Sequence, residues 1–262
     1  MDDALTFGPE QVPLSVLDLA PVPDGGSAGD ALRATIDLAR HAERLGFRRF
    51  WVAEHHNMPG IASSAPPVLI GHPFARITAV PGRGHQPAMW LLGSSGYSAQ
   101  VAGLLGLPFA FAHHFSPANT IPALALYRSH FRPSDVLDRP HAMVAAAVVC
   151  ADTDERARFL AGSGALSFLR LRSGRPGPLP SPEEAAAYPY HDLERAFIED
   201  RQATQILGAP ETVRQGLADL LKATAADELM LTTMVYDPAD RLRSFELVAA
   251  LARTPVRVSG RR

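Results

Sequence analysis

The stretch Gly46–His56, with the sequence GFRRFWVAEHH, decides the fold of this chain. Its glycine is of the kind that ends a helix, and the apolar run Phe50–Ala53 after it is typical of a strand buried on both faces of a parallel sheet. The run stops at an acid and two imidazoles, Glu54–His56. In an α/β barrel the reacting groups lie at the carboxyl ends of the strands, so these side chains form a candidate site. The alternative is that they are partly exposed loop residues.

Strands and helices alternate on both sides of this stretch. Before it, a predicted helix over Ala31–Leu45 can be capped by Ser27 or Asp30 and ends at Gly46. A strand, a helix and a strand with short connections form a right-handed crossover unit with parallel pairing. The predicted strands are Pro13–Leu19, Phe50–Ala53, Ala88–Leu92, Pro108–His114, Ala142–Cys150 and Asp227–Met234. Later helices are predicted over Pro117–Phe131, Asp152–Leu160, Asp192–Leu207, from Pro210 to near Thr224, and over Asp237–Ala252.

The composition indicates one α/β domain over residues 1–262. A chain of this length with 47% hydrophobic residues can bury a full core. The net charge of −2 gives no electrostatic footprint for nucleic acid. The single cysteine, Cys150, excludes an internal disulfide framework and a cysteine-based zinc site. No apolar run approaches the roughly 18–20 residues that span a bilayer, so we expect a cytoplasmic protein without a membrane anchor or a signal peptide.

Two segments interrupt the alternation. Residues 57–87 are rich in proline and form a compressed junction, with a weak strand at Ile77–Val80. This junction is too long for an ordinary connection and too short for two more strand–helix pairs. Residues 162–190 are rich in glycine, proline and arginine, and such an insertion is more often a lid or a subunit contact than a structural necessity.

A turn of small residues, Gly93–Ser98 (GSSGYS), follows the strand that ends at Leu92 and leads into a helix. Backbone amides and hydroxyls at the head of a helix can bind an anion, assisted by the helix dipole. The turn is therefore a candidate phosphate cradle without a lysine. A plain tight turn is the alternative.

Paired histidines end two of the strands, His55 with His56 and His113 with His114. Metal-dependent barrels gather histidines at strand ends, which makes a metal hydrolase a rival reading. Adjacent side chains on a strand point in opposite directions, so at most one histidine of each pair can face inward. No His-x-His pair accompanies them, and we predict no metal site.

Three runs together resemble the bacterial-luciferase-like, flavin-dependent oxidoreductases. They are LGFRRFWVAEHHNMPG from Leu45, WLLGSSGYSAQ from Trp90 and GAPETV from Gly208. The resemblance implies a (β/α)8 barrel that binds reduced FMN, delivered by a separate NAD(P)H-dependent flavin reductase. It also implies that oxygen adds to the flavin to give a C4a-peroxide, which oxidises a small organic substrate.

The same resemblance assigns roles to individual residues. His55 corresponds to the catalytic histidine of the family, and Glu54 to the acid beside it on the flavin side. The FMN-phosphate loop corresponds to Gly93, Ser94, Ser95, Gly96 and Tyr97.

The chain departs from the family pattern after His72, where two strand–helix units are missing. We therefore predict a luciferase-like TIM-barrel derivative that is incomplete, with about six of the eight parallel strands. A closed eight-strand barrel cannot lose two strands and keep its shear and tilt. The remaining strands could form an open sheet, a second copy could cover the gap in a homodimer, or residues 73–87 could fill it locally.

Two functions of different classes follow. The first is an FMN-dependent monooxygenase that acts on a small organic substrate with O2, with His55 as the acid or base. The second is a non-catalytic flavin-binding or assembly protein derived from such an enzyme by the loss of two units.

Overall fold

A computed structural model of the chain describes residues 5–8, 11–56, 58–64 and 89–253. Its strands are β1 (Thr6–Phe7), β2 (Val12–Asp18), β3 (Phe50–Val52), β4 (Leu91–Gly93), β5 (Phe109–Phe111), β6 (Ala142–Cys150), β7 (Ile206–Gly208) and β8 (Glu228–Thr232). Its α-helices are α1 (Ala28–Leu45), α3 (Gly96–Leu104), α4 (Thr120–His130), α5 (Asp154–Arg172), α6 (Pro182–Ala187), α7 (Asp192–Ala203), α8 (Pro210–Thr224) and α9 (Pro238–Arg253). A short 3-10 helix, η2 (Pro117–Asn119), precedes α4.

The strands form one sheet that is parallel except for β1. Strand β2 pairs with β3 on one side and β8 on the other, and β8 pairs with β6. Strand β6 also pairs with β5 and, through its last residues, with β7, while β4 extends the sheet beyond β5. Among the described strands β3 and β4 do not pair with each other, so the sheet is not closed. This confirms the prediction of an α/β fold that is an incomplete barrel.

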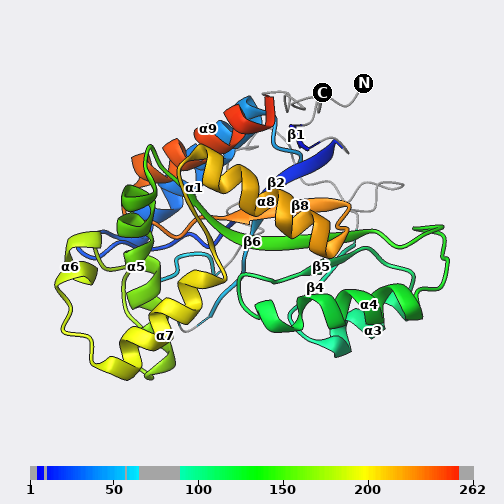
Figure 1. The fold of residues 1–262 in the computed structure, drawn as a ribbon, viewed down its shortest axis with the longest axis horizontal. Helices are drawn as coiled ribbons and strands as arrows, with labels where there is room; N and C mark the ends of the chain where they lie inside the picture. Colours follow the sequence, from blue (N-terminus) through cyan, green and yellow to red (C-terminus); the bar gives the residue numbers. More distant parts are fainter. Residues whose placement is uncertain (1–4, 9–10, 57, 65–88, 254–262) are drawn as a thin grey trace, which may run out of the picture.

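The helices cover the sheet in separate groups (Figure 1). Helices α8 and α9 lie along β6 and β8, whereas α3 and α4 pack together beside β4 and β5. Helices α5, α6 and α7 gather at the end towards which β6 runs. No helix in the described part of the chain is both long and apolar enough to cross a membrane.

Local signals in the sequence explain the first helix. The side chain of Ser27 accepts from the backbone N–H of Asp30, and the carboxylate of Asp30 accepts from the backbone N–H of Ser27, which is a capping box. Gly46 has φ 86°, a left-handed conformation that ends the helix at little steric cost. Both expected caps therefore act together.

Two predicted helix boundaries were wrong. The helix expected over Asp192–Leu207 ends at Ala203, and Ile206–Gly208 forms β7, a seventh parallel strand beside the six that were predicted. Three residues are too few to show a period, so pairing with the end of β6 decides this segment. Helix α5 runs to Arg172, past the expected end at Leu160, and therefore enters the predicted insertion 162–190.

Glycine allows the longer α5 to approach the sheet. A Cβ at Gly164 would lie 3.0 Å from the carbonyl oxygen of Met234, closer than almost any real Cβ contact. Gly164, which suggested an irregular segment, is thus a close-packing position within a helix.

A second, smaller core lies on the inner side of the curved sheet. Leu17, Met143 and Met230 are buried there, and Trp51 and Trp90 pack against them. The two indoles meet edge to face with ring centroids 5.8 Å apart. Because Trp51 belongs to β3 and Trp90 immediately precedes β4, this contact spans the two unpaired edges. We call it the tryptophan seam. The local repair expected from residues 73–87, including Ile77–Val80, falls outside the described residues.

A buried ion pair joins the end of β2 to α9. Arg241 Nη1 donates to Asp18 Oδ1 at 2.9 Å, and both side chains are less than 5% exposed. This pair fixes the carboxyl end of a central strand, next to the site described below.

Candidate active site

A cavity of about 350 Å³ opens at the carboxyl ends of the parallel strands. Its wall is formed by residues at or just after the ends of β2, β3, β4, β5 and β8, by the later residues of β6, and by side chains from α5 and α7. This volume lies within the roughly 300–1,000 Å³ of small-molecule sites. Most of the lining is apolar, and the titratable side chains in it are His55, His114 and Arg201. Among the described lining residues there is no carboxylate.

Of the first histidine pair, only His55 lines the cavity. Its backbone N–H donates to the carbonyl of Ser63 at 3.1 Å, and its Nδ1 atom is buried without a partner among the described residues. Burial lowers the pKa of His55, and the charge of His56 lowers it further. The imidazole is therefore neutral at pH 7, and the His55 side chain lines the cavity where a ligand would bind.

The two residues beside it point elsewhere. His56 Nε2 lies 2.9 Å from Glu54 Oε1, and both side chains are more than half exposed. Glu54 does not line the cavity as the structure describes it. The candidate acid is thus oriented towards solvent and paired with the outward histidine.

The turn after β4 contributes its first residues to the cavity. Gly93 and Ser94 line the wall, whereas Ser95 and Gly96 begin α3, and Tyr97 is 77% exposed. Ser95 occupies the N-cap position without a side-chain hydrogen bond to the helix. The first amide groups of α3 are thus left without a side-chain cap.

This turn is tight because glycine occupies its first position. A Cβ at Gly93 would overlap Ser98, whose hydroxyl donates to the carbonyl of Ser95 at 3.0 Å. A larger residue would push the start of α3 away from the end of β4.

Of the second histidine pair, only His114 lines the cavity, and both residues lie in a turn after β5 and not on the strand itself. Its Nδ1 atom lies 3.1 Å from the carbonyl oxygen of Ala145, so Nδ1 carries the proton and a neutral ring keeps Nε2 as an acceptor. Burial lowers the pKa of His114. His113 instead pairs with the hydroxyl of Thr120 at 2.8 Å. The sequence marked this pair, but only as potential metal ligands.

Arg201 is the one charged lining residue for which the sequence gave no signal. It lies on α7, and its guanidinium carbon is 3.5 Å from the centroid of the Phe168 ring. Its Nε atom is buried without a hydrogen-bond partner among the described residues. Burial lowers the pKa of Arg201 to about 10, so it stays cationic at pH 7. Arginine is frequent in this chain, and no local pattern separates this one from the others.

Part of the predicted insertion forms another wall of the cavity. Pro176 and Gly177 line it, and a Cβ at Gly60 would overlap the carbonyl oxygen of Gly177. The Leu179 N–H donates to the Val22 carbonyl at 2.7 Å, which anchors the segment beside the end of β2. The segment is therefore placed to cover the cavity, and its role as a lid stays a prediction.

Metal ligands do not converge in the described part of the chain. No group of three or more His, Cys, Asp or Glu side chains there is placed to hold an ion.

The sequence of this chain is similar to those of a known protein family. The luciferase-like monooxygenase family matches residues 12–76 and 71–228. The uncharacterized protein YvbT of Bacillus subtilis is 38% identical over 320 residues, which cover 90% of this chain and 95% of that protein. A protein of Escherichia coli named luciferase-like monooxygenase is 34% identical, over 90% of this chain and 96% of its own length.

Two solved structures have a fold similar to that of this chain. The crystal structure of apo-MsnO8 has a TM-score of 0.82 and 29% identity, covering 92% of this chain and 98% of its own. The oxygenating constituent of 3,6-diketocamphane monooxygenase from Pseudomonas putida, a type II Baeyer–Villiger monooxygenase in complex with FMN, has a TM-score of 0.64 and 16% identity. It covers 92% of this chain and 98% of its own, and at this identity the likeness shows the fold alone.

The alignments also locate the departure from the family pattern. They extend over 320 residues, whereas this chain has 262, so the relatives carry residues that it lacks. The two matched parts meet at residues 71–76, where the loss after His72 was predicted. The chain belongs to the luciferase-like monooxygenase family.

Proposed function

We propose that this protein is a flavin-dependent monooxygenase that uses FMN and O2 to oxygenate a small organic substrate. The observation that carries the proposal is that His55 and Ser94, which leave two different strands, line a single cavity. When bound, reduced FMN supplies the two electrons with which one oxygen atom enters the substrate and the other leaves as water. The reduced flavin comes from a separate NAD(P)H-dependent reductase, and we place the protein in the cytoplasm as a homodimer.

The residues present fit the phosphate of FMN. Ser94 offers a hydroxyl in the cavity wall, and the amides of Gly96 and Tyr97 begin a helix that no side chain caps. By contrast, the side chains of Ser27 and Thr153 cap α1 and α5. An uncapped helix start beside a cavity is suited to an anion, because free N–H groups and the helix dipole act together.

His55 is proposed as the acid or base of the reaction. Its imidazole lines the cavity and can take a proton from the substrate or return one to it, and its lowered pKa leaves the ring neutral at pH 7. Ser63 holds the backbone at this position, so the imidazole is presented from a fixed point beyond β3. We propose that Glu54 acts only indirectly, through its pair with His56.

Besides a phosphate site and an acid or base, the proposed reaction requires that water be excluded from the cavity. Leu17, Phe168 and Leu207 contribute to an apolar wall that keeps reactive oxygen species from solvent. Pro176 and Gly177 lie over the same wall and are proposed as its cover.

Reconstitution of the purified chain with FMN tests the proposal. We expect reduced FMN to bind, and oxygen consumption with a flavin reductase to rise when a substrate is added from a panel of aldehydes, ketones and carboxylates. If reduced FMN binds but no member of the panel raises oxygen consumption, the non-catalytic flavin-binding or assembly function is supported, as the loss of two barrel units would favour. No affinity for either redox state of FMN would exclude both functions.

A further inference from the structure

Arg201 is a cation without a counter-ion in an apolar cavity. The described part of the chain places no carboxylate in the cavity wall and no charged partner beside this side chain. An unpaired charge removed from water is costly, and an anion bound beside it offsets much of that cost. The free protein thus holds a charge whose complement is expected to come from a ligand.

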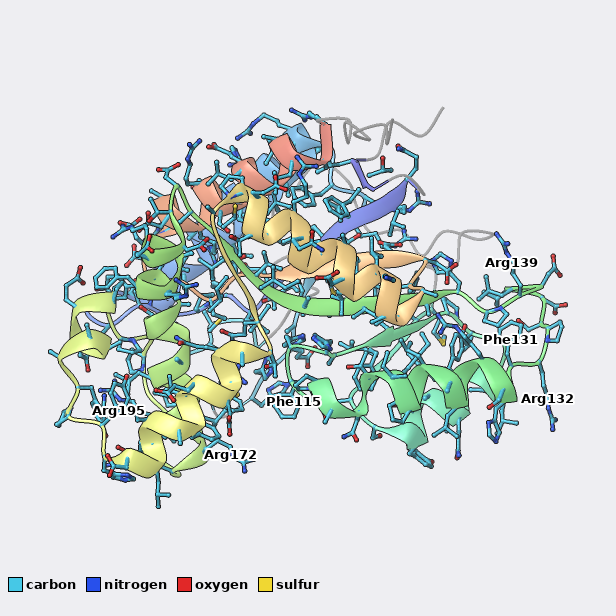
Figure 2. The ribbon with its side chains drawn as sticks, in the orientation of Figure 1. Phe115, Phe131, Arg132, Arg139, Arg172 and Arg195 are labelled. Atoms are coloured by element: carbon cyan, nitrogen blue, oxygen red, sulfur yellow. The ribbon has the colours of Figure 1, made fainter. Side chains whose placement is uncertain are left out.

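Aromatic rings fix the orientation of this guanidinium. Phe168 lies against its face, and the Phe197 ring is parallel to Phe168, with an interplanar angle of 2° and centroids 5.9 Å apart. Phe115 meets Phe168 edge to face at 6.4 Å, and Figure 2 shows it between α7 and the pair α3 and α4. A guanidinium that stacks through its face keeps its N–H groups free along its edge, where they match the two oxygens of a carboxylate.

The residues around Arg201 suit the same ligand. His114 is close enough for the charge of Arg201 to act on it, and Gln205 also lines this part of the cavity. The side-chain amide of Gln205 can donate a hydrogen bond to a carboxylate, and neutral His114 adds no negative charge that would compete with the ligand.

The phosphate of the flavin has a separate place in the proposed function. Its cradle begins α3, whereas Arg201 lies on α7, and Figure 1 shows α7 at the lower left and α3 at the lower right. We therefore propose that Arg201, on its Phe168–Phe197 stack, binds a carboxylate of the substrate, so that the substrate is an organic acid rather than a neutral carbonyl compound. This inference rests on the proposed function for the identity of the ligand as a substrate, but the binding site can be tested without flavin.

Calorimetric titration with hexanoate and with hexanamide, its neutral analogue of similar shape, tests the assignment. The wild-type chain, with and without FMN, is expected to bind hexanoate at least about tenfold more tightly than hexanamide, the range of a charge-assisted pair. Arg201→Met should reduce this preference to near one, and Arg201→Lys should keep part of it because the charge remains. Arg195→Met is the matched control, since Arg195 is exposed on the same helix and donates to the Tyr190 carbonyl.

Several outcomes would overturn the assignment. Equal affinity of the wild-type chain for both probes, or no binding of hexanoate with or without FMN, would exclude a carboxylate site and needs no variant to fold. A loss of FMN affinity in Arg201→Met, with riboflavin affinity unchanged, would show that Arg201 serves the flavin phosphate instead. If hexanoate binds selectively while no flavin binds at all, the anion site stands and the proposed monooxygenase function fails.

Discussion

At the scale of single residues, neighbouring histidines have opposite environments. His55 lines the cavity, whereas His56 faces solvent and pairs with Glu54. A similar division occurs at His113 and His114, where a turn after β5 directs only His114 to the cavity. Of two adjacent histidines, one is thus placed for chemistry in the cavity, and the other makes a contact at the surface.

This division gives the first prediction. His55→Ala should lower turnover by about 10²–10⁴-fold, the usual contribution of a general acid or base, while FMN affinity changes much less. His56→Ala is the control and should leave turnover close to that of the wild type. Steady-state oxygen consumption and flavin titration measure the two quantities. An equal loss of turnover and flavin affinity would mean that His55 only packs against the ligand.

The lowered histidine pKa values predict how stability depends on pH. Burial lowers the pKa of His55, His113 and His114 below 6.5, so the unfolded chain binds protons more readily than the folded chain in this window. The free energy of unfolding should therefore fall as pH drops below about 6.5 and level off above it. The lowered pKa of Asp30, about 2, acts only at more acidic pH.

Calorimetric melting between pH 5 and 7.5 checks this expectation. His114→Gln should weaken the pH dependence, because it removes one of the titrating groups. A melting temperature that rises as the solution becomes more acidic would contradict the burial of these imidazoles.

At the scale of elements, the sequence predicted those that carry local signals. Helices α1 and α8 were expected because a capping serine, a terminal glycine and a proline in the first turn mark their ends. Strand β7 was missed because three residues show no period, and its strand state depends on the end of β6, far away in the chain. Long-range pairing of this kind leaves no local trace.

In the candidate site, too, the sequence predicted only those residues that local signals mark. His55, Gly93 and Ser94 follow apolar strands, so their place at one end of the sheet could be inferred. Arg201 could not, since its role depends on Phe168 from another helix. The direction of Glu54 was also hidden, because it depends on which neighbour binds the carboxylate.

The ion pair between β2 and α9 gives a prediction at this scale. Arg241→Met should lower the free energy of unfolding by about 3–5 kcal/mol, because it leaves Asp18 charged and buried without its partner. Arg243→Met on the same helix is the control. Arg243 is exposed and pairs at the surface, so its loss should change stability little. Urea unfolding measures the free energy of unfolding of both variants. Equal losses would show that the buried pair of Asp18 and Arg241 contributes no more to stability than a surface pair.

At the scale of the whole molecule, the tryptophan seam joins two edges that no described backbone pairing closes. Trp51 and Trp90 meet at 5.8 Å, and the guanidinium of Arg49 lies 5.1 Å from the Trp90 ring. Among the described residues, these side chains make the contact between β3 and the residue before β4.

A double-mutant cycle tests the seam. Trp51→Leu and Trp90→Leu should each destabilise the protein, and the double variant should lose less than the sum by about 0.5–1.5 kcal/mol, the coupling of an aromatic pair. Trp51→Leu combined with Val213→Ala on α8 is the control and should be additive within about 0.5 kcal/mol. Additivity of the two tryptophan variants would show that the indoles do not support each other.

The pairing of β2 with β8 has a consequence for biosynthesis. Leu14 of β2 pairs with Leu229 of β8. Strand β2 is among the first to leave the ribosome, and it cannot complete this pairing until β8, one of the last, has been synthesised. At roughly 5–20 residues per second this delay is on the order of 10–40 s, during which the nascent chain exposes an apolar strand edge. A messenger truncated before the codons for β8 would release a polypeptide in which both β2 and β6 lack a neighbour, and such a product is expected to aggregate or to be degraded.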